Sequence, residues 1–322
     1  MISEIVLQQA ALSIIARRRI APWLPVTPCL QSRSAFDDGS SLFFKAENFQ
    51  KTGSFKFRGA LSKLTSLPTN VPVITASSGN HGLALATAAQ QTGHTLTVVL
   101  PETVAREKLS RIESLGVEIV LHSNDAGKAE LHAQYLAKER GNVYVSPYND
   151  DQVIAGQGTA ALELLEQQPE LDVVYISMGG GGLISGMGAV IKAYSPRTRV
   201  VGVSAVHSAA LAASIRAGQV VEVEHSDTLA DGVAGGIDEG TRTLPLAIDV
   251  VDDLIDCTED QIADGIRMFA WNEKMLVEGS AGLALAAWLA DRDANAGKKS
   301  AVLLCGANFD RTKIAPIIGA GS

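Results

Sequence analysis

Lys56 is the residue of this sequence with the clearest potential for covalent chemistry. It stands between Phe55 and Phe57, so burial of the segment would take its ammonium group out of water. Desolvation disfavours the charged form, lowers the lysine pKa and frees the amine as a Schiff-base nucleophile. The alternative is a lysine that reaches from a half-buried element into solvent, which is the commoner situation for this residue type.

A run of four glycines, Gly179, Gly180, Gly181 and Gly182, follows one predicted strand and precedes a predicted helix. Glycine lets the backbone approach a ligand closely, and a helix N-terminus presents free N–H groups to an anion. The run lacks the spaced GxGxxG pattern of dinucleotide sites and the Gly-Lys-Ser/Thr ending of nucleoside-triphosphate loops. It therefore predicts a cradle for another kind of phosphate group, with a tightly packed turn as the alternative.

Two further segments place polar side chains directly after predicted strands. Ser77, Ser78, Asn80 and His81 bring hydroxyl, amide and backbone N–H groups to a helix start, which suits a carboxylate ligand. Alternatively, Ser78 or Asn80 simply caps that helix. Cys305 follows the last predicted strand, where it is either a small buried side chain or a ligand contact.

An alternation of strands and helices must position these segments. Such alternation is typical of parallel sheets with helical crossovers, in which ligands bind beyond the carboxyl ends of the strands. A capping box formed by Thr258 and Gln261 marks the start of one helix. The predicted strands are 71–76, 95–100, 117–121, 173–177, 199–204 and 300–304, and the predicted helices are 83–91, 102–115, 126–140, 183–194 and 258–275.

Composition narrows the class of protein. The 322 residues are 46% hydrophobic and 19% charged, which is typical of a globular protein of one large or two smaller α/β domains. A net charge of −8 and the lack of a long apolar run lead us to expect no nucleic-acid or membrane partner. Three scattered cysteines, and no positive charge before Arg17, favour a cytoplasmic protein without disulfides.

Taken in order and spacing, these segments resemble the fold-type II pyridoxal-phosphate (PLP) enzymes, specifically the serine/threonine dehydratase and serine racemase family. The resemblance covers nearly the whole chain and includes Thr27-Pro28, Lys45-Ala46-Glu47-Asn48, Val277-Glu278-Gly279-Ser280-Ala281-Gly282 and Cys305-Gly306-Ala307-Asn308. It implies a tryptophan synthase β-like α/β fold with two open, twisted, mostly parallel sheets flanked by helices. It also implies a homodimer, a large PLP-binding domain of residues 1–64 and 147–322, and a small inserted domain of residues 65–146.

The resemblance implies a role for each candidate residue. Lys56 is similar to the lysine that forms the internal aldimine and exchanges a proton with Cα. Ser78 matches the serine that reprotonates Cα in racemases, and Cys305 the neutral residue facing the pyridine nitrogen. The implied cofactor contacts are Phe55, Lys56, Asn80, Gly179, Gly180, Gly181, Gly182, Glu278 and Cys305, and the implied substrate contacts are Ser77, Ser78, Asn80 and His81.

The implied reaction is dehydration and deamination of a small β-hydroxy amino acid, such as L-threonine or L-serine, to a 2-oxo acid and ammonia. Alternatives are β-replacement, serine racemisation and dehydration of 3-hydroxyaspartate. A hydroxyectoine-pathway dehydration is a further alternative, because residues 227–236 and 277–282 resemble the hydroxyectoine-utilisation dehydratase branch. A non-catalytic protein that binds PLP or an amino acid for regulation is a further alternative. Ser204 and Ala210 stand where metal-activated members carry acidic ligands, so we expect no metal there.

Overall fold

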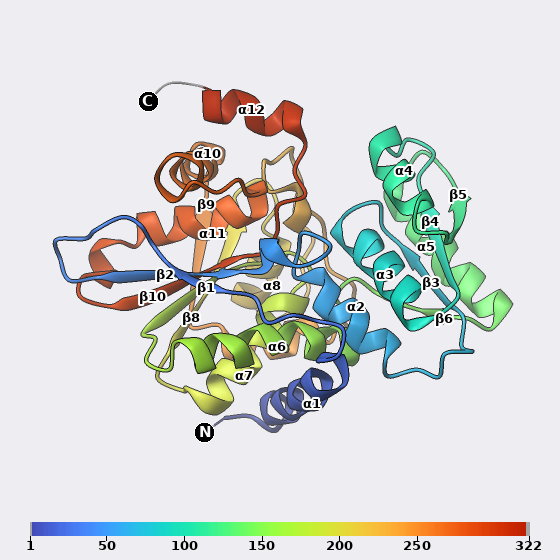
Figure 1. Cartoon of the computed structure of the whole chain (residues 1–322), viewed down its shortest axis with the longest axis horizontal. Coiled ribbons are helices and arrows are strands. Elements are labelled where there is room, and N and C mark those ends of the chain that lie inside the picture. Colours follow the sequence, from blue (N-terminus) through green and yellow to red (C-terminus); the bar gives the residue numbers. More distant parts are fainter. Residues whose placement is uncertain (1, 320–322) are drawn as a thin grey trace.

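The computed structural model describes residues 2–319 and contains two sheets with helices packed around them (Figure 1). The six-stranded sheet is parallel throughout except for its first pair, β1 and β2, which is antiparallel. In spatial order its strands are β1 (Cys29–Gln31), β2 (Ser41–Ala46), β10 (Lys299–Leu304), β7 (Val173–Ser177), β8 (Arg199–Ala205) and β9 (Asp253–Cys257).

The second sheet has four strands, all parallel, and lies with α3, α4 and α5 on the right of Figure 1. In spatial order the strands are β5 (Glu118–Leu121), β4 (Leu96–Leu100), β3 (Val73–Ala76) and β6 (Val143–Tyr144). The predicted fold class, an α/β protein with mostly parallel sheets, is therefore confirmed.

Helices connect the strands of both sheets. They are α1 (Glu4–Ile20), α2 (Lys56–Leu64), α3 (Asn80–Thr92), α4 (Arg106–Glu113), α5 (Ala126–Arg140), α6 (Asp151–Gln167), α7 (Gly182–Tyr194), α8 (Ala210–Ala217), α9 (Thr243–Val250), α10 (Glu259–Met268), α11 (Gly279–Ala290) and α12 (Arg311–Gly319), with short helical turns η1 (Glu47–Phe49), η2 (Asp231–Val233), η3 (Phe269–Glu273) and η4 (Asp293–Asn295). None of the helices among residues 2–319 is both long enough and apolar enough to cross a membrane.

The predicted helix from Thr258 to residue 275 is correct at its start and wrong at its end. The capping box of Thr258 and Gln261 is present, with both reciprocal hydrogen bonds. However, α10 ends at Met268 and continues as the π-helical turn η3, which Lys274 terminates in the left-handed region at φ 60°. The predicted helix 102–115 is also shorter in the structure, where α4 covers eight residues.

The main core lies around the centre of the six-stranded sheet. Every residue of β7 is buried, and β8 and β10 are buried except at their first residues. Central parallel strands are covered on both faces, so their sequences are continuous apolar runs instead of alternating ones. Rigid central strands give the loops at their carboxyl ends a fixed position.

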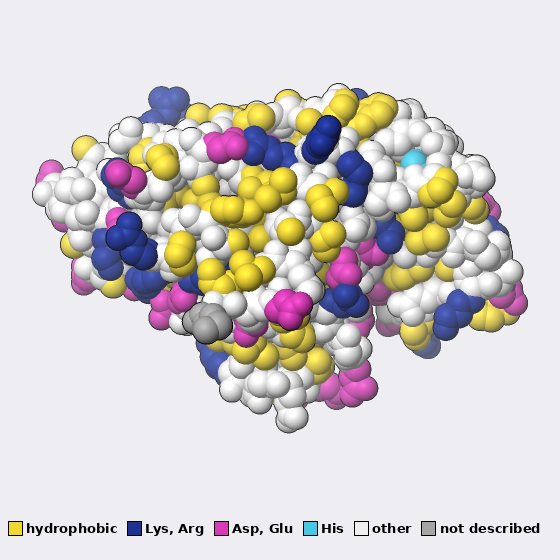
Figure 2. Space-filling model, turned by 90° about the horizontal axis from the view of Figure 1, so that it is seen from below, with side chains coloured by type: hydrophobic (Ala, Val, Ile, Leu, Met, Phe, Trp, Pro, Cys, Tyr) yellow, Lys and Arg dark blue, Asp and Glu magenta, His cyan; other side chains and the backbone are white. Residues whose placement is uncertain are grey.

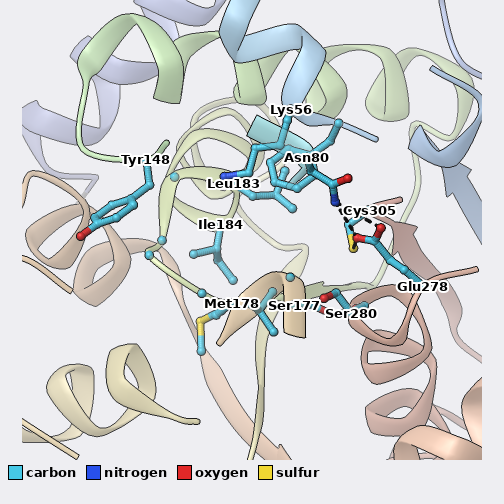
Figure 3. A pocket seen from close by; sticks show the side chains of 17 residues that line it. Lys56, Asn80, Tyr148, Ser177, Met178, Leu183, Ile184, Glu278, Ser280 and Cys305 are labelled. Carbon is cyan, nitrogen blue, oxygen red and sulfur yellow. Dashed lines mark hydrogen bonds between the residues drawn. The ribbon is translucent and has the colours of Figure 1, made fainter. Parts of the chain in front are cut away.

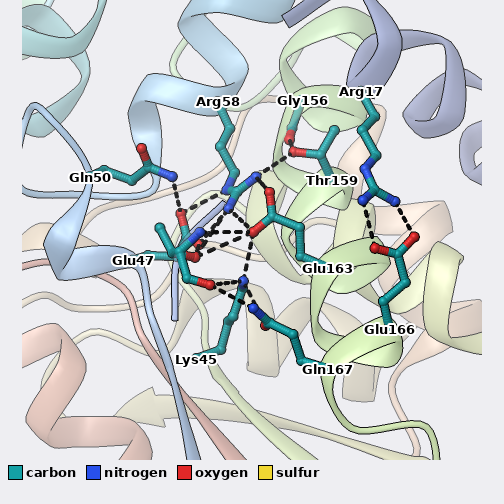
Figure 4. A network of polar contacts seen from close by, with 11 residues as sticks. Arg17, Lys45, Glu47, Gln50, Arg58, Gly156, Thr159, Glu163, Glu166 and Gln167 are labelled. Atoms are coloured by element: carbon teal, nitrogen blue, oxygen red, sulfur yellow. Dashed lines mark hydrogen bonds and ion pairs between the residues drawn. The ribbon is translucent and has the colours of Figure 1, made fainter. Parts of the chain in front are cut away.

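A buried ion network fixes the start of α2 (Figure 4). Arg58 is fully buried and donates to the carboxylates of Glu47 and Glu163, at 2.7 Å in each case. Lys45 Nζ lies 2.6 Å from the same Glu163 carboxylate. Burial alone would raise the pKa of Glu163, but the hydrogen bonds and charges of Arg58 and Lys45 together outweigh it and hold that pKa below its usual value. The network ties α2 to β2, η1 and α6, two residues away from Lys56.

Candidate active site

The structure brings the predicted segments together at the carboxyl ends of strands from both sheets. The glycine run follows β7, Cys305 follows β10, and Ser77 follows β3, while Lys56 opens α2. All of the predicted cofactor contacts line one pocket (Figure 3). These residues are Phe55, Lys56, Asn80, Gly179, Gly180, Gly181, Gly182, Glu278 and Cys305.

The pocket opens into a larger cavity of about 820 Å³, which is a usual size for a small-molecule site. Ser77, Ser78 and His81 line this cavity together with Lys56 and Asn80. All of the candidate residues named from the sequence therefore border one continuous space between the two sheets.

The side-chain amine of Lys56 is desolvated, as its position between two phenylalanines predicted. Its Nζ donates a hydrogen bond to the carbonyl oxygen of Pro147 at 2.8 Å and lies 5.2 Å from the ring centroid of Phe55. Burial lowers the pKa of Lys56 to about 8. A much larger fraction of the amine is consequently neutral near physiological pH than for an ordinary lysine.

The glycine run is both a packed turn and an open anion site. A Cβ on Gly180 would lie 2.4 Å from the ring of Tyr148, and Gly181 adopts φ 90°, so side chains are excluded at both positions. In the part of the chain that the structure describes, the N–H groups of Gly179, Gly180 and Gly181 make no hydrogen bond. With the first turn of α7 directly behind them, these groups are free to bind a phosphate.

Glu278 lies at the centre of a polar cluster beside Cys305 (Figure 3). Its carboxylate accepts hydrogen bonds from Asn80 Nδ2 at 3.0 Å and from the backbone N–H of Asn308 at 3.0 Å, and the Cys305 thiol lies 3.8 Å away. Burial raises the pKa of Glu278. Burial and the nearby Glu278 charge raise the pKa of Cys305, so that its sulfur remains a neutral thiol.

The segment from Ser77 to His81 is open where a carboxylate would bind. Gly79 is the N-cap of α3 and no side chain caps that helix, so the alternative that Ser78 or Asn80 serves as its cap is wrong. Ser77 Oγ accepts from Gly79 N–H at 3.2 Å. The ring of His81 is buried, and its Nε2 lies 3.2 Å from the carbonyl oxygen of Val145. Burial lowers the pKa of His81 to about 3, so the ring is neutral.

Tyr148 is a site residue that sequence reasoning missed. Its ring packs on Gly180 and its hydroxyl accepts from the Asp238 N–H at 3.0 Å, which ties the glycine run to the segment after η2. The available signal was its position shortly after β6, at the carboxyl edge of a parallel sheet. Because β6 has only two residues, that strand was not predicted.

The comparisons with known proteins agree on one family. The family model described as "Pyridoxal-phosphate dependent enzyme" matches residues 20–306. The chain is 38% identical to an L-threonine ammonia-lyase of Thermotoga maritima, over 88% of this chain and 71% of that protein. It is 34% identical to an L-threo-3-hydroxyaspartate ammonia-lyase of Saccharomyces cerevisiae, over 94% of each.

The residues of the pocket fit this cofactor. A lysine amine of lowered pKa can bond to its aldehyde, and the unpaired N–H groups of the glycine run can take its phosphate. The neutral thiol of Cys305 can face an unprotonated ring nitrogen.

A solved structure has a similar overall fold. Maize serine racemase superposes with a TM-score of 0.88 at 33% identity, covering 95% of each chain. The chain therefore belongs to the fold-type II family of pyridoxal-phosphate dependent enzymes, and pyridoxal 5'-phosphate is its cofactor.

Proposed function

We propose that this enzyme catalyses β-elimination of a small β-hydroxy amino acid, such as L-threonine or L-serine, to a 2-oxo acid and ammonia. The observation that carries the proposal is the placing of the Lys56 amine and the neutral Cys305 thiol in one pocket. The names of relatives that are ammonia-lyases, at 34% to 38% identity, support the same reaction class.

When bound, PLP supplies the electron sink for charge that develops at the substrate Cα. Lys56 acts as the base that removes the Cα proton, and its lowered pKa makes the neutral amine available near physiological pH. The Pro147 carbonyl oxygen, 2.8 Å away, orients that amine. The Cys305 thiol does not hold a proton on the ring nitrogen as a carboxylate would, which favours rapid loss of the β-hydroxyl over transamination.

The remaining site residues bind and orient. We propose that the cofactor phosphate binds the N–H groups of Gly179 to Gly182, and that Phe55 flanks the cofactor ring. Asn80 and Glu278 are proposed to contact the cofactor beside Cys305. Ser77, Ser78, Asn80 and His81 are proposed to hold the substrate carboxylate, His81 through its backbone because its ring bonds to Val145.

We further propose the two-domain division at residues 1–64 with 147–322, and 65–146. In support, all four strands of the smaller sheet come from residues 73–144, and the six-stranded sheet takes its strands from before and after that stretch. The candidate site lies where the two sheets meet. Movement of the smaller domain toward the larger would exclude water from the substrate.

We also propose that the enzyme is a cytoplasmic homodimer. α1 buries one face against α6 and α7, yet Leu7, Ala11 and Ile14 form an apolar stripe on its outer face. Figure 2 views the side of the molecule on which α1 lies and has hydrophobic side chains gathered across its middle. Exposed apolar stripes of this kind are typical of subunit interfaces.

Racemisation is the second candidate, and Ser78 is the observation that favours it. Its hydroxyl-bearing side chain lines the same cavity as Lys56, as a second proton carrier for Cα would. The match to maize serine racemase supports this candidate.

The two candidate reactions, elimination and racemisation, are distinguished by their products. PLP-loaded protein would be given L-threonine, L-serine, their D-forms and L-threo-3-hydroxyaspartate, with measurement of 2-oxo acid release and of amino-acid chirality. Oxo acid release supports elimination, whereas enantiomer formation without it supports racemisation. Lys56→Ala should lose the Schiff-base absorbance and elimination together, and wild-type turnover by this variant would refute the catalytic assignment.

A further inference from the structure

A cation at the substrate cavity has no carboxylate partner. Arg111 on α4 is exposed and lines the cavity of about 820 Å³ together with Lys56 and Ser78. Within residues 2–319 its guanidinium makes no ion pair, and its one side-chain hydrogen bond runs from Nη2 to Asn308 Oδ1 at 3.1 Å. An arginine in a cleft without a counter-ion is available for an anionic ligand.

The hydrogen bond to Asn308 holds this guanidinium beside residues 77–81, the proposed substrate-carboxylate segment. Asn308 Nδ2 donates to Asn80 Oδ1 at 2.7 Å, so two hydrogen bonds through one residue join Arg111 to Asn80. α4 also packs against the first turn of α3, because a Cβ on Gly82 would lie 3.6 Å from Ile112 Cδ1. The fold thus holds the Arg111 guanidinium close to residues 77–81.

The segment itself offers only neutral donors to a carboxylate. Ser77 and Ser78 contribute hydroxyl groups, Asn80 an amide and His81 its backbone N–H, while burial lowers the pKa of the His81 ring and keeps that ring uncharged. A carboxylate bound there would gain a charge-assisted pair only from a neighbouring cation. The planar fork of a guanidinium suits a carboxylate because it can donate two parallel hydrogen bonds.

The acidic side chains of the cavity do not compete with a substrate carboxylate for Arg111. Three carboxylates line it besides Glu278, and each already has a partner within hydrogen-bond or ion-pair distance. These partners are Lys313 for Asp231 at 3.6 Å, Asn149 for Asp238 at 3.2 Å and Tyr144 for Glu130 at 2.8 Å.

We propose that Arg111 binds the α-carboxylate of the amino-acid substrate, exchanging its hydrogen bond to Asn308 for a charge-assisted pair. The proposal rests on the proposed function, because it takes residues 77–81 as the carboxylate segment. It makes Arg111 a substrate-binding residue and requires a free α-carboxylate on every good substrate.

The test compares Arg111→Gln with Arg106→Gln in the PLP-loaded enzyme. Arg106 is an exposed cation on the same helix but does not line the cavity. The ligands are L-alanine and L-alaninol, in which a hydroxymethyl group replaces the carboxylate, and binding is measured from the cofactor's visible absorbance. Arg111→Gln should weaken L-alanine binding roughly 10- to 100-fold, the range for a hydrogen bond to a charged group, without weakening L-alaninol. Arg106→Gln should change neither.

Weakening of both ligands to the same extent, or of neither, would overturn the proposal. Arg111→Lys should recover part of the L-alanine affinity, because it keeps the charge and loses the fork. If Arg111→Gln impaired only L-threo-3-hydroxyaspartate and left L-alanine binding intact, Arg111 would serve a second carboxylate and the proposal would be wrong. L-Alanine has no β-hydroxyl to lose, so these outcomes are independent of whether the enzyme eliminates water.

Discussion

Burial of Lys56 has a consequence that can be measured in the absence of substrate. Burial lowers its pKa to about 8 from an ordinary 10.5, so its proton leaves at lower pH in the folded than in the unfolded protein. The neutral amine is the reactive form. Without cofactor, acylation of Lys56 by a small reagent should therefore rise with pH through a midpoint near 8.

Competitive labelling followed by mass spectrometry can follow Lys56 alone. The denatured protein is the control, since an unfolded lysine titrates at about 10.4. A midpoint near that value in the folded protein as well would show that burial does not depress this pKa, and would remove one support for Lys56 as the base.

Individual residues of the site could be predicted from the sequence, but their partners could not. Lys56, Cys305 and the glycine run come together only in space, yet each carries a local signal in residue type or position after a strand. The carboxylate of Glu278 accepts from Asn80, 198 residues away, and from the backbone of Asn308. No local pattern encodes such a pairing, because it depends on how two sheets meet.

At the level of elements, the glycine run is constrained by Tyr148 more than by its own flexibility. Gly180→Ala would place a Cβ 2.4 Å from the Tyr148 ring, and one of the two must shift. Overpacking typically costs about 1–3 kcal/mol, so we expect PLP affinity to fall about tenfold or more. The measurement is a PLP titration of the apoenzyme followed by absorbance.

Gly236→Ala is the matched control for that substitution. Gly236 lines the same cavity, but a Cβ added to it would have no other atom within 4 Å, and its φ is not in the left-handed region. PLP affinity should stay at the wild-type value. Equal affinity of the two variants would mean that the loop relaxes around an added methyl group, contrary to the packing argument.

The buried ion network is a second constraint on how the elements pack, because it ties α2 to β2, η1 and α6. Arg58→Met would leave the buried carboxylate of Glu47 without a cation and that of Glu163 with Lys45 alone, and breaking a buried pair in this way typically costs about 3–5 kcal/mol. The free energy of unfolding, from urea denaturation, should fall by that amount. Arg17→Met removes the half-exposed ion pair with Glu166 and should cost less than about 1 kcal/mol.

A loss in Arg58→Met no larger than in Arg17→Met would contradict this account of the network. It would mean that the fold relaxes, or that water enters, to satisfy both carboxylates at little cost.

Sequence patterns predicted the ends of some strands and helices correctly but not those of others. The strands with continuous apolar runs were predicted to within two residues, because burial on both faces leaves a strong signal. α10 ends instead in a π-helical turn closed by Lys274, a residue type with no preference for the left-handed region. The turn is held by contacts with distant segments, such as those of Glu273 with Ser32 and Arg33.

At the scale of the whole molecule, the two sheets explain why the site needs both halves of the fold. The glycine run and Cys305 come from the six-stranded sheet, whereas Ser77 and Asn80 follow a strand of the smaller one. If the proposed function holds, a substrate between them would contact both, and its binding would favour movement of the smaller domain toward the larger. The sequence could indicate which segments face the cleft, but the relative placement of the sheets required the structure.

The homodimer proposal makes its own prediction at this scale. The stripe of Leu7, Ala11 and Ile14 on α1 lies opposite the face that packs on α6 and α7, so burial in a subunit interface is the simplest use of it. Sedimentation velocity should give a mass of two chains for the wild type. Ile14→Asp should shift the enzyme toward one chain, because it places a charge in an apolar interface.

Leu131→Asp, at an exposed apolar residue of α5, is the control and should remain dimeric. Circular dichroism of both variants would separate dissociation from unfolding. A wild type that sediments as one chain would refute the homodimer. A dimer that withstands Ile14→Asp would place the interface elsewhere and leave the α1 stripe as exposed surface.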